Sequence, residues 1–157
     1  MPDRPHARGL IDTSVLIDLD LFDPATLPSE LQISAVTLAE IAAGPHATTD
    51  QAERARRQER LQRVEATFEP LPVDANVARA YGRAYAAVAA GGSKIRGRRG
   101  FDLLIAATAL AAGLPLYTRN PADFSELSDL LEIISAKPIE DASTGRDGIG
   151  PPQPKGG

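Results

Sequence analysis

The sequence predicts an α/β fold built around a central, mostly parallel sheet. Short β-compatible runs alternate with longer helical patterns, which is typical of consecutive βα units. The chain has 157 residues, of which 43% are hydrophobic, and this is enough for one domain with a substantial core. Positions 138–157 hold four Pro and five Gly but almost no large apolar residue. We therefore predict one folded domain over residues 8–137 and a disordered Pro/Gly-rich tail over residues 138–157.

The apolar pattern gives the predicted elements in order. Each expected strand is a short apolar run, and each expected helix carries apolar residues three or four positions apart. The strands are expected at residues 9–11, 31–34, 114–118 and 130–134, with a weaker candidate at 71–73. The helices are expected from Thr13 or Ser14 through Leu19, and at residues 35–43, 51–67, 75–90 and 101–112, with a small helical turn opening at Pro121.

Capping and turn residues justify the helix ends. Thr13 or Ser14 is expected to cap the first helix, and Thr49 with Asp50 caps the Arg-rich third helix. Gly and Pro then stop the helices, as at Gly44-Pro45 and Gly113.

Four acidic residues stand among apolar or small neighbours, where an ionised carboxylate is costly without a partner. They are Asp12, Glu40, Asp102 and, less sharply, Asp123. Asp12 follows the first strand and Asp102 opens a helix, and ligands of open α/β sheets bind at the carboxyl ends of strands. Converging carboxylates favour a hard divalent cation, Mg²⁺ or Mn²⁺.

Each acid also has a purely structural interpretation. Asp12 can cap the first helix, Asp102 can interact with its helix dipole, and Glu40 can be an exposed helical residue. The chain has no Cys and two His, which excludes disulfides, thiolate nucleophiles and Cys-based zinc sites. Neither His6 nor His46 has a neighbour at ligand spacing.

The net charge of −4 is the sum of two unlike regions. Residues 53–99 carry 11 basic and 5 acidic residues, whereas the rest of the chain carries 6 and 16. A basic stretch at 92–100 opens directly into Asp102, and we expect it to be a mobile loop that contacts phosphates. Its candidate substrate-binding residues are Lys94, Arg96, Arg98 and Arg99, to which we add Arg119. The arginines between 54 and 63 are interpreted as a solvated helix face.

Four segments together resemble the successive motifs of a known family. They are LIDTSVLI at 10–17, ISAVTLAEI at 33–41, FDLLIAATA at 101–109 and YTRNPADF at 117–124. In this order and spacing they resemble the PIN-domain ribonucleases, and among these the VapC toxins of bacterial type II toxin–antitoxin pairs. The resemblance covers about residues 9–135.

The resemblance implies a three-layer α/β/α fold and a Mg²⁺- or Mn²⁺-dependent endoribonuclease. It further implies a homodimer that acts on RNA and is inhibited by a cognate VapB-type antitoxin. By position, Asp12 and Asp102 would be the principal metal ligands, and Glu40 would complete the acidic site. The fourth position falls within 118–123, where many relatives have an acid directly after the strand.

This chain departs from the family's pattern at that fourth position. Asn120 stands after the strand, and Asp123 follows three residues later, so either residue could contribute. The hydroxyls of Thr13 and Thr118 are expected beside the carboxylates. Ser34 is a weaker candidate, which we expect to cap a helix.

Two other functions remain open from the sequence. A Mg²⁺-dependent phosphatase or phosphoryl-accepting domain also uses an Asp at a strand end, but Asp12-Thr13-Ser14 lacks the paired acid that it needs. A non-catalytic, PIN-like RNA-binding module would have lost Asp12, Glu40 or Asp102. No apolar run approaches the roughly 18 residues of a membrane span, so we expect no membrane contact and a cytoplasmic location.

Overall fold

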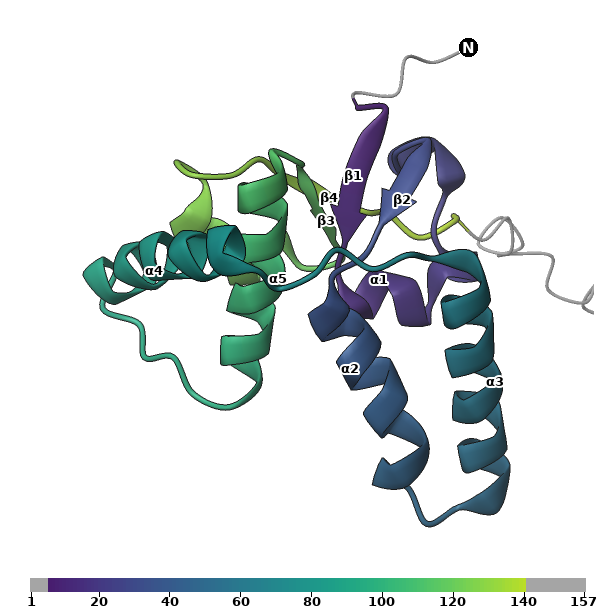
Figure 1. Ribbon diagram of the computed structural model, residues 1–157. Coiled ribbons are helices and arrows are strands. Elements are labelled where there is room, and N and C mark those ends of the chain that lie inside the picture. Colours follow the sequence, from purple (N-terminus) through teal and green to yellow (C-terminus); the bar gives the residue numbers. More distant parts are fainter. Residues whose placement is uncertain (1–5, 141–157) are drawn as a thin grey trace, which may run out of the picture.

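The structure, a computed structural model, describes residues 6–140 and is built on a four-stranded sheet (Figure 1). The strands are β1 (Arg8–Ile11), β2 (Glu30–Gln32), β3 (Leu116–Thr118) and β4 (Ile133–Ser135). They lie in the order β2-β1-β3-β4, and all three pairings are parallel. The predicted α/β fold class with a parallel sheet is confirmed.

Five α-helices and four short 3₁₀ segments complete the described fold. The helices are α1 (Thr13–Ile17), α2 (Ala35–Ala43), α3 (Gln51–Thr67), α4 (Ala75–Ala90) and α5 (Arg98–Ala112). The 3₁₀ segments are η1 (Leu19–Leu21), η2 (Pro24–Thr26), η3 (Gly44–Ala47) and η4 (Pro121–Leu127). Within residues 6–140, no helix combines the length and apolar character that crossing a membrane requires.

Alternate residues of the central strands build two cores, one on each face of the sheet. On one face, Leu10 and Leu116 pack with buried residues of α4 and α5. On the other face, Ile11 and Tyr117 pack with buried residues of α1, α2 and α3. Figure 1 shows the same division, with α4 and α5 on one side of the sheet and α1 and α3 on the other. These are the three layers that the resemblance implied.

Acidic and hydroxyl side chains cap the helices. Asp12, Ser34, Asp50 and Asp74 each accept a hydrogen bond from a backbone amide in the first turn of α1, α2, α3 and α4. The expectation that Thr13 or Ser14 caps the first helix was wrong, because the helix already begins at Thr13 and the Asp12 carboxylate reaches its amides first. The cap predicted for Ser34 is confirmed.

Two other elements differ from the prediction. Residues 71–73 form no strand, and only Leu71 makes an isolated parallel bridge, to Ser34. Helix α5 begins at Arg98, three residues before the predicted start at Phe101. Gly97 allows this earlier start, because it precedes the helix with a φ of +56° that favours glycine. Arg98 and Arg99 therefore lie in the helix and not in a loop.

The predicted tail begins in contact with the domain. Pro138 forms an antiparallel bridge with Phe22, and the amide of Ile139 donates to Leu21 O at 2.8 Å. Residues 141–157, the greater part of the predicted disordered segment, lie outside the described residues, so that prediction is untested.

The strand order places the predicted site at a topological switch point. The chain leaves β1 toward β2 on one side, and later returns to form β3 on the other side of β1. In open α/β sheets, ligands bind outside the carboxyl ends of the strands at such a point. Asp12 follows β1 and Asn120 follows β3 at this edge.

Candidate active site

Asp12 is buried at the junction between β1 and α1, with 6% of its surface exposed. Its Oδ1 accepts hydrogen bonds from the Val15 amide at 3.0 Å and from Ser14 Oγ at 2.7 Å. Both bonds use the same oxygen, which leaves Oδ2 available to another partner. The capping interpretation is therefore correct, and it is compatible with a second role in binding a cation.

Glu40 projects from α2 and is held by a neighbouring hydroxyl. Thr13 Oγ1 donates to Glu40 Oε1 at 2.8 Å, and Thr37 Oγ1 lies 3.0 Å from the same Thr13 oxygen. The other oxygen, Oε2, lies 3.9 Å from Arg98 Nη2. Only 19% of the Glu40 side chain is exposed. The alternative interpretation of Glu40 as an exposed helical residue is therefore wrong.

Asp102 lies in α5 among other negative charges. Burial raises the pKa of Asp102 to about 6 from its usual 3.8, and the charges of Glu40, Asp12 and Asp123 add to the rise. Arg98 opposes it. Asp12 before α1, Glu40 in α2 and Asp123 in η4 therefore all lie within electrostatic reach of Asp102 in α5.

Asp123 lies next to Asp102. Asp102, Asp123 and Arg99 line one small cavity of about 10 Å³. Asn120 and Asp123 are both exposed, and the backbone amide of Asn120 donates to the hydroxyl of the buried Thr118 at 3.2 Å. The Thr118 hydroxyl therefore shapes the turn after β3.

The basic candidates differ in how freely they can meet a substrate. Lys94, Arg96 and Arg98 are exposed, and Arg98 is the one that faces Glu40. Arg99 instead pairs with Glu126, its Nη2 lying 2.6 Å from Oε2. Arg119 is 3.1 Å from Asp18 and lies over the ring of Phe22.

The basic stretch before α5 is anchored rather than a freely mobile loop. Ser93 Oγ donates to Glu126, and Ile95 packs against the core on the α4–α5 face. This anchoring contact could not be predicted from the sequence, because Glu126 lies 33 residues from Ser93, in a turn where an acid is common. A hydroxyl and a branched apolar residue within the basic stretch were the only available signals.

The donor set fits a hard divalent cation in kind, since Asp12, Glu40, Asp102 and Asp123 offer only carboxylate oxygens. After burial, the charges of Glu40, Asp12 and Asp123 contribute to the raised pKa of Asp102, so negative charge surrounds this carboxylate. Over residues 6–140, however, no three acidic or His side chains are gathered closely enough to form a complete metal site as they stand.

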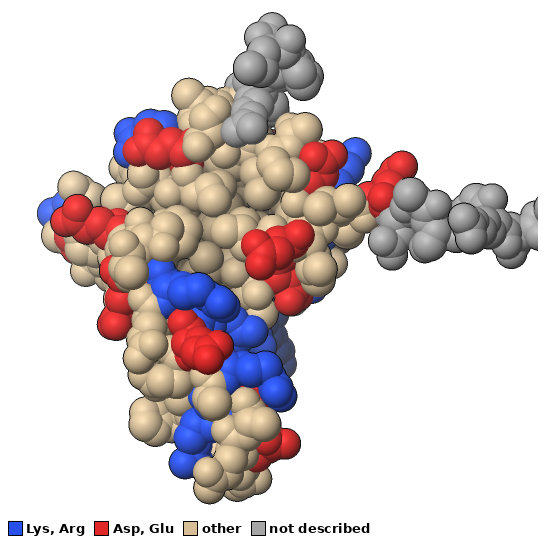
Figure 2. All heavy atoms as spheres, turned by 90° about the vertical axis from the view of Figure 1, so that its right-hand side faces the viewer, with Lys and Arg blue, Asp and Glu red and all other residues tan. Residues whose placement is uncertain are grey.

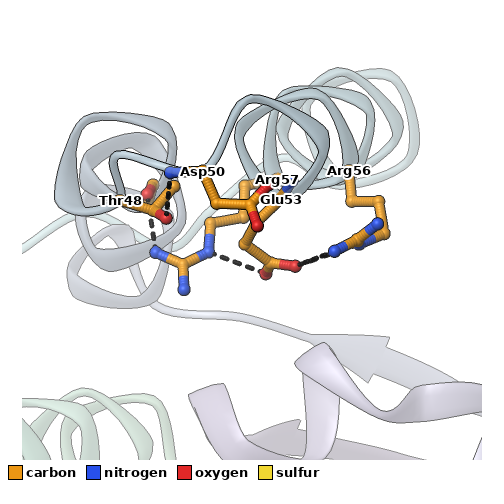
Figure 3. Close-up of polar contacts among 6 residues, drawn as sticks. Thr48, Asp50, Glu53, Arg56 and Arg57 are labelled. Carbon is orange, nitrogen blue, oxygen red and sulfur yellow. Dashed lines mark hydrogen bonds and ion pairs between the residues drawn. The ribbon is translucent and has the colours of Figure 1, made fainter.

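The arginines of α3 form a separate basic band. Figure 2 shows Lys and Arg side chains running along the side of the molecule that carries α3. Near the start of α3, Glu53 accepts hydrogen bonds from Arg56 and Arg57 (Figure 3), which hold the pKa of Glu53 below its usual value. Arg54 donates to Thr48 O at 3.0 Å. These arginines support the interpretation as a helix face.

Two further arginines of α3 border a groove of about 560 Å³ between α1, β2 and α3. Its apolar lining residues include Leu16, Val64 and Phe68. Arg60 and Arg63 line one part of it, while Asp20 and Glu30 supply acidic groups to the lining.

Residues 9–130 match the sequence profile of the PIN domain. This match extends over most of the chain, and it includes the four acidic residues and the strands that position them. The chain therefore belongs to the PIN domain family, as its motifs predicted.

Within this family the chain is similar to a VapC ribonuclease. It is 37% identical over 124 residues to Ribonuclease VapC5 of Mycobacterium tuberculosis (strain ATCC 25618 / H37Rv), covering 77% of this chain and 88% of that relative. The crystal structure of VapBC-5 from Mycobacterium tuberculosis, a member of the VapBC family of toxin–antitoxin systems, matches with a TM-score of 0.71. That match is 35% identical and covers 83% of this chain and 98% of the other.

A more distant structure shares the fold. FitAcB from Neisseria gonorrhoeae matches with a TM-score of 0.63 at 24% identity, over 80% of this chain and 95% of the other. The predicted resemblance to PIN-domain ribonucleases of VapC type is confirmed. Nucleases of this kind generally depend on a divalent metal.

Proposed function

We propose that this protein is the toxin of a type II toxin–antitoxin pair, a Mg²⁺- or Mn²⁺-dependent endoribonuclease that hydrolyses RNA phosphodiester bonds. The observation that carries the proposal is the electrostatic proximity of Glu40, Asp12 and Asp123 to Asp102, at the switch point of the sheet. The relationship to a VapC ribonuclease supports the same activity.

The four carboxylates would hold the cation between them. Asp12, Asp102 and Glu40 are the proposed principal ligands, and Asp123 is favoured over Asn120 for the fourth position because it shares a cavity with Asp102. A divalent cation at this position supplies charge that activates a water and stabilises the phosphoryl oxygens. The chain itself fixes the carboxylate oxygens. The Val15 amide donates to Asp12 Oδ1, and the Thr13 hydroxyl donates to Glu40 Oε1.

Exposed basic residues beside the acidic cluster would receive the RNA backbone. Among them, Arg98 lies beside the acidic cluster, because its guanidinium faces Glu40. When a cation binds the Glu40 carboxylate, this guanidinium would be free to contact a phosphate. Lys94 and Arg96 lie just before it and are free to make further phosphate contacts.

The groove between α1, β2 and α3 is the proposed docking site of the VapB-type antitoxin. A groove lined by apolar residues together with Arg60 and Arg63 suits a segment that has an apolar face and an acidic flank. The similar VapBC-5 structure is of a toxin–antitoxin system, which supports a protein partner of this kind. We also propose a homodimer in the cytoplasm, where the RNA and the antitoxin are present.

The proposal is tested by sequencing RNA ends after brief expression of the wild type and of Asp12→Asn. We expect new ends at defined sites with the wild type, and none with the variant. Purified wild type should cleave RNA with Mg²⁺ or Mn²⁺ and stop when the cation is chelated. Release of phosphate from small esters with intact RNA would instead indicate a phosphatase, and RNA binding without cleavage would indicate a non-catalytic module.

A further inference from the structure

Thr37 is a buried polar residue that the proposed chemistry does not yet use. It lies on α2 one turn before Glu40, and its surface is 0% exposed. Its hydroxyl is 3.0 Å from Thr13 Oγ1, which contacts Glu40. Because Val has nearly the same shape, packing alone does not require a hydroxyl at this position.

The direction of this hydrogen-bond chain follows from the number of protons. A hydroxyl has one proton to donate, and an ionised carboxylate can only accept. Thr13 uses its proton on Glu40 Oε1 at 2.8 Å. Thr13 must therefore accept from Thr37, and the donation runs from Thr37 to Thr13 to Glu40.

A second buried threonine shows that a helical Thr hydroxyl can donate its proton elsewhere. A helical Thr can donate to the carbonyl four residues earlier. Thr108 in α5 does so, to Leu104 O at 2.8 Å. In α2 the equivalent carbonyl, Ile33 O, accepts the amide of Leu71 at 2.9 Å. The proton of Thr37 is directed toward the acidic cluster instead.

We propose that Thr37 is a positioning residue for Glu40 and acts through Thr13. Fixing Thr13 fixes Oε1 of Glu40, so that the other oxygen, Oε2, is presented on the side where Arg98 lies. The inference rests on the proposed function, in which Glu40 helps to hold a divalent cation. Loss of an outer partner of a metal ligand typically lowers affinity about 10–100-fold, and we expect the lower end, about tenfold, for this indirect contact.

The test measures Mn²⁺ affinity of the purified full chain by calorimetry, without RNA, together with thermal stability. Thr37→Val should raise the Kd for Mn²⁺ about tenfold. Its shape is conserved, so Tm should fall only by the few degrees that the lost Thr37–Thr13 hydrogen bond corresponds to. Thr37→Ser should keep the wild-type Kd but lower Tm, because the missing methyl group leaves a small cavity. If Thr37 had only a structural role, the variant with the lower Tm would also have the higher Kd for Mn²⁺. Wild-type affinity in Thr37→Val would overturn the inference.

Two controls make the comparison specific. Thr108→Val removes a buried hydroxyl that does not contact Glu40, and should leave the Kd for Mn²⁺ unchanged. Thr13→Val should raise the Kd, and adding Thr37→Val to it should have no further effect if Thr37 acts only through Thr13. A further rise in the Kd of the double variant would contradict this route.

Failure of the inference is distinguishable from failure of the proposed function. A wild type that binds no Mn²⁺ and leaves RNA intact overturns both. A wild type that does both, with Thr37→Val unchanged, overturns the role of Thr37 alone. If Thr37→Val does not fold, Thr37→Ser and Thr37→Ala provide the same comparison, since they differ only in the hydroxyl.

Discussion

Arg99 and Glu126 join the first turn of α5 to η4, with Arg99 Nη2 donating to Glu126 Oε2 at 2.6 Å. Ser93 donates to the other oxygen of the same carboxylate. Asp102 and Asp123 lie on the two segments that this ion pair connects. Glu126 therefore holds together the two segments that carry two proposed metal ligands. Arg99 is held by this hydrogen-bonded ion pair, whereas Arg98 is more exposed and lies 3.9 Å from Glu40 Oε2.

This difference predicts different effects for two adjacent arginines. Arg98→Ala should weaken RNA binding and make the dependence of log Kd on log salt concentration shallower by about 0.7, the value of one phosphate contact with a single strand. Arg99→Ala should leave that slope unchanged and destabilise the fold by about 1 kcal/mol, because the pair is only partly exposed. RNA binding is measured by fluorescence anisotropy over a range of NaCl concentrations, in an Asp12→Asn background that prevents cleavage.

Thermal unfolding of the same two variants provides the control. Only Arg99→Ala should lower Tm. A shallower salt slope in Arg99→Ala, with none in Arg98→Ala, would mean that the ion pair opens when RNA binds and that Arg99 contacts the substrate.

Sequence alone was sufficient where the signal is local. Asp12 and Asp102 were identified because a carboxylate interrupts an apolar run, and the helices were found from their spacing and caps. The Arg99–Glu126 pair could not be found in this way, because its partners lie 27 residues apart. The role of Thr37 could not be predicted either. Its helix has an ordinary amphipathic sequence, and its contact with Thr13 is formed only in the folded structure.

Asp102→Asn should raise stability above about pH 6. The pKa of Asp102 is raised to about 6 in the fold from 3.8, so folding at pH 7 must keep a carboxylate charged where burial and nearby charges disfavour it. The variant removes this cost and should raise Tm by a few degrees, since 1 kcal/mol corresponds to roughly 2–4 °C for a chain of this size.

The gain should depend on pH in a defined direction. Between pH 6 and 4 the native wild type takes up the proton itself, so its stability relative to Asp102→Asn should recover as the pH falls. Metal-free protein is compared by calorimetry at several pH values. An advantage of the variant that is constant from pH 8 to pH 4 would argue against a raised pKa for Asp102.

Asp123 and Asn120 are separated by their effect on cation binding. Asp123→Asn should raise the Kd for Mn²⁺ at least about tenfold, because Asp123 shares a cavity with Asp102. Asn120→Ala should have little effect. The control is Asp129→Asn, which removes an exposed carboxylate shortly after η4. Equal losses in Asp123→Asn and Asp129→Asn would indicate a general charge effect rather than a ligand.

The groove beside α3 can be tested through its two arginines. Replacing Arg60 and Arg63 by Glu reverses the charge of these two positions in the groove lining. The new carboxylates would repel the acidic flank of the antitoxin segment, so the yield of co-purifying antitoxin should fall at least about tenfold. RNA cleavage by the purified toxin should be unchanged. The matched control replaces Arg54 and Arg56, on the same helix but outside the groove lining. Equal loss of antitoxin in both variants would contradict a specific docking role.

Tyr117 gives a prediction about stability that is independent of the proposed function. Its Oη is buried without a hydrogen-bond partner among the described residues, and its ring lies so close to β1 that a Cβ on Gly9 would be 2.4 Å from Cε2. An unpaired buried hydroxyl costs about 1–3 kcal/mol, so Tyr117→Phe should stabilise the fold by about 1 kcal/mol or more and raise Tm. The Gly9→Ala variant should do the opposite, because its methyl group would overlap the ring. If Tyr117→Phe lowers Tm instead, the hydroxyl has a hydrogen-bond partner in the folded protein, such as a buried water.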